Sequence, residues 1–509
     1  MDRRNFLQSI AGLGVATSGW PGAGLLARPS GPPAYFGLHP FIEAHPEAVF
    51  IRKTAVASKN DSEGKKREAL ELAKRIFTLR HTPGIPLSHK FAFKPNLTAT
   101  DGSGLTYAII TDPYVVEGLV AGMGQVGIEA ESIYVRDGLW PDQPGIGYRE
   151  MSQRSGVHYD DGDSRDPASK ECPGGVVFRR TKYLGPFNYS DTHLLNVSKL
   201  KAHAMGLTLC VKNLQGTNTQ PYLQFCGGLQ RPIAQDFQPD ARRHVDDLYA
   251  KHRQAGIPRW DTWGANRMEM WVHRTIDSYS LIRPSIMLNI IEGVYAQNGD
   301  GFRGGPGPNG VPQIFMTNVF IFGKDAFRVD IIGHWLGGHE PGNFGLFHLA
   351  KERGVSTALN PHNIPVYHWE DGGPKLAPLE QFARTPLTTM YLPRSGEPRY
   401  HLCNEPFAYP TEAQSACLSG HDLPGLRVLG QAKQGKGSSS LLIEYNLPAD
   451  GHAALEMYDV FGQRVGVLAQ GWIRRGVHVA DWSTQEAAPG LYCCRLVSNG
   501  VTLAQAAWV

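Results

Sequence analysis

A strand, a loop, a helix and a second strand follow one another between residues 90 and 135, and this order constrains the fold more than any other feature. Residues 90–97 are typical of a strand that stops at a proline. Asp112 then caps a helix that has Pro113 at its first position, and Gly127 ends it. Because a strand–helix–strand unit pairs its strands in parallel with a right-handed crossover, the sequence predicts a parallel sheet.

The same pattern of buried strands and amphipathic helices returns at 285–340. We therefore expect an α/β fold with a mixed or mainly parallel sheet core and flanking helices, over residues 45–371. Residues 217–280 have irregular periodicity and are expected to form an insertion or cap. In parallel sheets, ligands gather at the carboxyl ends of the strands. Lys94 and Asn96 stand at one such end.

Cations set among apolar runs distinguish residues 198–216. If the first part is a strand, Lys199, Lys201 and His203 project from one face, since side chains alternate along a strand. Burying ammonium groups is costly, so this face either is solvated or binds something negative. The alternative without a ligand is a solvated strand edge on which the lysines prevent pairing with other chains.

Lysines hold carboxylates or phosphates as point charges, and a histidine titrates near neutrality. We assign catalytic roles on this basis to His203, Lys201 and Lys212. The backbone N–H groups of the glycine-rich loop 299–307 suit an oxyanion. The residues expected to bind substrate are Lys94, Asn96, Lys199, Asn213, Gly301 and Gly304. Glu292 and Asp325 are the candidate metal ligands.

Composition excludes several functional classes, among them nucleic-acid binding and iron–sulfur proteins. The chain has 509 residues and a net charge of +3, and no basic run suits a nucleic acid. No apolar run is long enough to span a bilayer in the mature chain. None of the seven cysteines forms a C-x-x-C pair, so iron–sulfur cluster motifs are absent. Cys403 and Cys417 either form a disulfide or are two buried thiols.

Residues 1–29 carry the sequence Asp-Arg-Arg-Asn-Phe-Leu-Gln near their start, followed by a Gly/Ala-rich apolar stretch. The segment resembles twin-arginine (Tat) signal peptides. The resemblance implies the Tat translocase as a partner and export through the inner membrane to the periplasm.

Five motifs, in order, resemble the DUF362 family, whose function is not established. The motifs are Phe93-Lys-Pro-Asn-Leu97, Ser198-Lys-Leu-Lys-Ala-His203, Val211-Lys-Asn-Leu-Gln-Gly216, Asn289-Ile-Ile-Glu-Gly293 and Gly323-Lys-Asp-Ala-Phe-Arg-Val-Asp330. Many relatives carry a cysteine-rich ferredoxin module. Since this chain lacks one, the resemblance implies no iron–sulfur role.

The C-terminal part differs in pattern. Residues 372–436 are rich in Pro, Gly and Ser and are expected to be a linker. In residues 437–509, apolar and polar side chains alternate along short stretches that are separated by regularly spaced turns. This pattern predicts a small all-β sandwich. The turns at Tyr458–Gly462 and Pro489–Tyr492 resemble the type A sorting domain of the type IX secretion system, or the FlgD-like Ig module. The resemblance implies type IX machinery as a partner and a cell-surface or secreted location.

The sequence thus predicts an exported DUF362-like protein with an anion- or metal-binding pocket at the strand ends, and a small anionic ligand. The alternative is a non-catalytic cell-surface or secreted ligand-binding protein. The cofactor stays open, with a metal ion as one alternative. Hydrolase, metalloprotease and P-loop signatures are absent from the sequence.

Overall fold

A computed structural model describes most of the chain between residues 35 and 508. The ranges outside it within that span are 82, 99–105, 139–144, 160–168, 220–221, 224–233, 258–264, 302–303, 392–397, 410–424, 435–437, 448, 460–462, 484–491 and 499–500. The expected signal segment and Cys417 lie outside the described residues.

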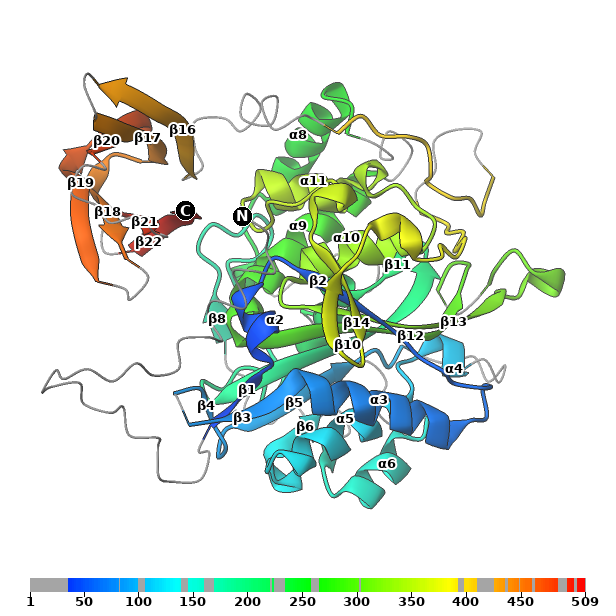
Figure 1. The fold of residues 1–509 in the computed structure, drawn as a ribbon. Coiled ribbons are helices and arrows are strands. Elements are labelled where there is room, and N and C mark those ends of the chain that lie inside the picture. The colour runs from blue at the N-terminus through cyan, green and yellow to red at the C-terminus, as the bar shows by residue number, and fades with distance from the viewer. Residues whose placement is uncertain are drawn as a thin grey trace, which may run out of the picture.

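One large mixed sheet forms the centre of the molecule (Figure 1). Its strand order is β15-β14-β2-β13-β12-β10-β5-β6-β7, and β11 pairs with β10 alone. The bounds are β2 Val49–Lys53, β5 Lys90–Pro95, β6 Ile133–Val135, β7 His158–Tyr159, β10 Thr192–His203, β11 Gly206–Thr208, β12 Ile286–Gln297, β13 Ile314–Gly323, β14 Val366–Glu370 and β15 Gly373–Leu376. Two smaller sheets are formed by β1 Tyr35–Leu38, β3 Phe77–Arg80 and β4 Ile85–Pro86, and by β8 Ser169–Glu171 and β9 Arg180–Lys182.

The middle of the large sheet is parallel. Strand β10 lies between β5 and β12 and runs parallel to both, while β12, β13 and β2 pair antiparallel. The register places Asn196 opposite Lys94 on one side and opposite Asn289 on the other. The expectation of an α/β fold with a mixed, mainly parallel sheet is confirmed.

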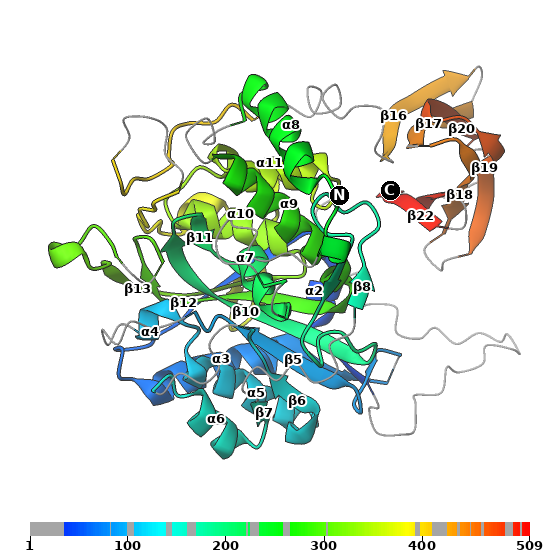
Figure 2. The same ribbon diagram turned by 180° about the vertical axis from the view of Figure 1, so that it is seen from behind.

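Helices cover both faces of this sheet (Figures 1 and 2). Helices α3, α5 and α6 lie on one face, and α9, α10 and α11 lie on the other. Each face has its own buried apolar cluster. The helix bounds are α2 Pro40–Ala44, α3 Ser62–Ile76, α4 Thr106–Ile109, α5 Pro113–Gln125, α6 Tyr148–Ser155, α7 Cys210–Asn213, α8 Ala241–Gln254, α9 Ala265–Ile282, α10 Ala326–Leu336 and α11 Gly345–Glu352.

Helix α5 begins and ends as its sequence predicts. The Asp112 carboxylate accepts the N–H of Tyr114, Pro113 is the first helical residue, and Gly127 follows the helix at φ +82°. Gly122 lets α5 approach α3, because a Cβ there would lie 2.2 Å from the Cβ of Ala73. The strand–helix–strand unit is therefore present, and β5 and β6 are parallel.

Two segments expected to stand apart contribute to the core. Helix α9, in the expected insertion or cap 217–280, buries Trp271 and Ile276 against the sheet. The described part of the expected linker does the same, because Leu387 and Cys403 belong to this core cluster. Pro- and Gly-rich composition did not distinguish a linker from an irregular segment that packs on the domain.

The C-terminal region has two antiparallel sheets with a separate apolar core. One sheet has the order β16-β17-β20 and the other β19-β18-β21-β22. Their bounds are β16 Gly425–Gln434, β17 Ser438–Leu447, β18 Gly451–Tyr458, β19 Arg464–Ile473, β20 Gly476–Ser483, β21 Tyr492–Ser498 and β22 Val501–Trp508. Ile443, Leu455 and Leu496 are fully buried in this core. None of the described helices is long and apolar enough to cross a bilayer.

Candidate functional site

Polar side chains gather where β5, β6 and β10 reach their carboxyl ends. Lys94, near the end of β5, and Asp137, just after β6, form a buried ion pair with Nζ and Oδ2 2.8 Å apart. The same Nζ donates to Oδ1 of Asn213 at 3.1 Å. Burial lowers the pKa of Lys94, and the charge of Asp137 opposes that effect. Gly216 is required beside this pair, since a Cβ there would lie 2.4 Å from both side chains.

A row of asparagine amides extends this network across the sheet. Asn213 Nδ2 donates to Oδ1 of Asn196 at 2.8 Å, and Asn196 Nδ2 donates to Oδ1 of Asn289 at 2.9 Å. Asn213 also donates to the backbone oxygen of Lys94 at 2.9 Å, and Asn96 Nδ2 lies 3.4 Å from Asn213 Oδ1. Because each amide is held by its neighbours, the network fixes Asn213 and Lys94 relative to the strands.

The short helix α7, which carries Lys212 and Asn213, is fixed by a carboxylate from α10. Asp330 accepts the backbone N–H groups of Cys210 at 2.7 Å and Val211 at 2.9 Å. Burial raises the pKa of Asp330 to about 8, although these hydrogen bonds oppose the effect. Asp330 therefore caps the first turn of α7 and fixes its position relative to α10.

Lys199 lies on the opposite face of β10 from Asn196. Its Nζ is 2.6 Å from Oε2 of Glu292, and both side chains are buried. Glu292 also accepts the backbone N–H groups of Asp112 and Val294. Lys199 and Glu292 therefore neutralise each other beneath α4 and α5. Within the described part of the chain, Lys199 does not take part in the hydrogen-bond network around Lys94.

Lys201 and His203 lie farther along β10, beyond the last residue pair that it forms with β5. Burial lowers the pKa of His203 well below its usual value, and the charges of Lys212 and Lys201 add to the effect. Lys212 also lowers the pKa of Lys94. Lys212 is thus within electrostatic range of both Lys94 and His203.

The alternation expected along β10 is present. Leu200 and Ala202 enter the apolar cluster on one side, while Lys199 and Lys201 have no exposed surface on the other. Since β10 is also an interior strand with neighbours on both sides, the alternative of a solvated strand edge is wrong for these lysines.

The glycine-rich loop begins directly after β12 and approaches the end of β10. Gly301 has φ +120°, and a Cβ there would lie 2.9 Å from Cδ2 of His203. Gly304 accepts the backbone N–H of Asp300 through its carbonyl at 3.0 Å. The structure therefore places Gly301 against the imidazole of His203, whereas Gly304 closes the loop.

The two candidate metal ligands are not brought together. The β12–β13 register pairs Asn289 with Gly323 and puts Glu292 and Asp325 about five residues apart along the strands, or about 17 Å. Asp325 caps α10, where it accepts two backbone N–H groups, and Glu292 is engaged as described above. Among the described residues, no group of three or more His, Cys, Asp and Glu side chains is arranged to hold a metal ion. These carboxylates do not fit a shared metal.

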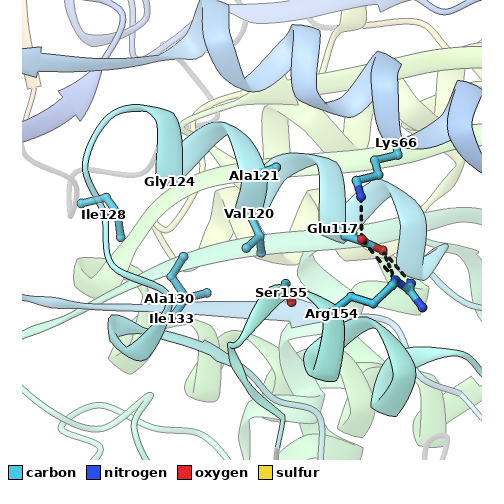
Figure 3. Close-up of a pocket in the computed structure, with 10 residues that line it drawn as sticks. All are labelled: Lys66, Glu117, Val120, Ala121, Gly124, Ile128, Ala130, Ile133, Arg154 and Ser155. Carbon is cyan, nitrogen blue, oxygen red and sulfur yellow. Dashed lines mark hydrogen bonds and ion pairs between the residues drawn. The ribbon is translucent and has the colours of Figure 1, made fainter.

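A separate pocket of about 240 Å³ lies among α3, α5, α6 and the start of β6 (Figure 3). The buried Glu117 stands at one end between Lys66 and Arg154, at 2.7 Å and 2.6 Å respectively. Apolar side chains such as Ile128 and Ile133 line the rest (Figure 3). None of the predicted site residues lines this pocket, and the ion pairs join the three helices.

Sequence reasoning missed Asn196 and Asn289. Each is a polar residue that interrupts a run of buried apolar residues, 194–197 in β10 and 287–291 in β12, and that interruption was the available signal.

Comparison with known proteins identifies a domain that contains the site. A model of a domain of unknown function, DUF362, matches residues 92–334. The chain carries a DUF362 domain. This match confirms the resemblance expected from the five motifs, and it includes every predicted site residue. No curated protein matches the chain.

Proposed function

We propose that the DUF362 domain binds a small anion at the carboxyl ends of β5 and β10, with Lys201 and Lys212 as the cationic partners. The observation that carries the proposal is the burial of a lysine and a histidine at this end of β10, where Lys201 has no exposed surface and His203 is 6% exposed. The charges of Lys212 and Lys201 lower the pKa of His203, which is consistent with cations close to it. Cations gathered in a weakly solvated place repel one another, and an anion between them relieves that repulsion.

The surrounding groups suit recognition of an oxyanion. Asn96 presents an amide whose orientation is held by Asn213 and Thr98. Asn213 holds Lys94 and Asn96 in place, since both of its own N–H groups donate to Lys94 and Asn196. Burial and the charges of Lys212 and Lys201 lower the pKa of His203, which favours its neutral imidazole. A neutral imidazole has one ring nitrogen that accepts a hydrogen bond or a proton.

We also propose that the protein is exported. The twin arginines Arg3 and Arg4 support Tat transport, and the turn motifs of residues 437–509 support type IX sorting to the cell surface. Fractionation of cells that express an Arg3→Lys/Arg4→Lys variant tests the first step. The variant protein should accumulate in the cytoplasm. Unchanged export would overturn Tat transport.

Calorimetric titration of the folded chain with inorganic phosphate, sulfate and succinate at low ionic strength tests anion binding. Lys212→Met should weaken binding at least about tenfold, since a hydrogen bond to a charged group contributes about 1.5–3 kcal/mol. Added salt should weaken binding of each anion to the unmodified protein.

Lys170→Met is the matched control. Lys170 is also half-buried, on β8, and its Nζ lies over the Tyr183 ring. This variant should bind the anions as the unmodified protein does. Equal effects of the two substitutions, or no binding of any anion, would refute the proposed site.

A further inference from the structure

The start of the glycine-rich loop holds buried acceptor atoms that a simple anion does not satisfy. Gln297 has no exposed surface, and its Oε1 accepts no hydrogen bond from any described residue. Oδ1 of Asp300 is likewise buried with no donor among the described side chains and backbone, while its Oδ2 lies 3.7 Å from the Arg399 guanidinium. Leaving a buried acceptor unsatisfied is costly, so such atoms call for a partner.

Both acceptors are next to the proposed anion site. Gln297 is the residue paired with Lys201 between β12 and β10, and paired residues project to the same face of a sheet. The Gln297 Nε2 donates to the carbonyl of Gly301, which fixes the amide and leaves the buried Oε1 as its acceptor. Gly301 packs on His203, and Asp300 immediately precedes it.

This part of the site combines two kinds of group that select for different features of a ligand. Lys201 and Lys212 attract negative charge, whereas Gln297 Oε1 and Asp300 Oδ1 require hydrogen-bond donors. An ammonium group is a donor, but the neighbouring lysines would repel it. A hydroxyl group donates without carrying charge.

We propose that the ligand of this site is a hydroxylated anion, whose carboxylate or phosphate meets the lysines while a hydroxyl donates to Gln297 and Asp300. This inference rests on the proposed anion site and adds the ligand's second functional group.

Two matched pairs of probes test it: malate against succinate, and glycerol 3-phosphate against propyl phosphate. Each pair keeps the anionic group and differs in hydroxyl groups. We expect the hydroxylated member to bind at least about tenfold more tightly, because a site built around a hydroxyl discriminates against the analogue that lacks it.

Gln297→Met keeps the side-chain length and removes the acceptor, so the preference within each pair should fall markedly. Lys212→Met should weaken both members and keep the preference. Gln238→Met, at an amide that bonds Gly175 instead, should leave the preference as it is.

Equal affinities within both pairs would overturn the hydroxyl assignment while the anion site stands. Tighter binding of aspartate than of malate would also overturn it, in favour of an amine. Failure of every probe, succinate and propyl phosphate included, would refute the anion site and the inference with it.

Discussion

Removing Lys199 should strongly destabilise the α/β part of the protein. Its Nζ lies 2.6 Å from Oε2 of Glu292, and the two side chains are 1% and 0% exposed. In Lys199→Met, the Glu292 carboxylate would stay buried and, among the described residues, would keep the backbone N–H groups of Asp112 and Val294 as its hydrogen-bond donors. Loss of one member of a buried ion pair costs about 3–5 kcal/mol, and we expect that loss in the free energy of unfolding.

Urea unfolding followed by circular dichroism measures this loss. Lys74→Met is the control, because Lys74 pairs with Glu71 at a similar 2.8 Å on the exposed surface of α3. That substitution should cost less than about 1 kcal/mol. The double variant Lys199→Met/Glu292→Gln should be more stable than Lys199→Met, since no unpaired charge remains. If Lys199→Met cost no more than Lys74→Met, the argument from a buried, mutually dependent pair would be refuted.

Two further predictions concern pH and backbone geometry. Burial lowers the pKa of His252, but hydrogen bonds to Glu269 and Glu352 outweigh it and raise the pKa to about 9. The difference between the usual pKa of 6.5 and about 9 corresponds to about 3 kcal/mol, which solvent screening at this partly exposed site reduces to roughly 2 kcal/mol. This stabilisation is complete below pH 6.5 and is lost as the pH rises through 9. The free energy of unfolding of His252→Gln should lack this pH dependence, and the same dependence in that variant would contradict the argument. Gly301→Ala should weaken anion binding measured by titration, because the added Cβ meets His203 and φ is +120°, and unaltered binding would contradict the close contact.

Much of the fold was predictable because the signals are local. The cap, the proline and the terminating glycine of α5 act within one or two turns of that helix. The alternation of Lys199 and Leu200 follows from strand geometry alone. Such features depend on neighbours in the chain, so the sequence shows them directly.

The site was only partly predictable, because its contacts join distant segments. The hydrogen bond between Asn196 and Asn289 spans 93 residues, and that between Asp330 and Cys210 spans 120. Register decides which of these groups meet, and one residue of slip would send each side chain to the opposite face.

The sequence by itself determined the α/β class, the strand ends that carry Lys94, Lys201 and His203, and the DUF362 motifs. The tertiary structure decided that Lys199 closes on Glu292 under α4 and α5 while Lys212 reaches the region of His203. The physical reason is that alternation assigns a side chain to a face, but only the packed sheet and its helices decide what covers that face. A buried lysine is stable where the fold supplies an opposite charge, and that charge lies far away along the chain.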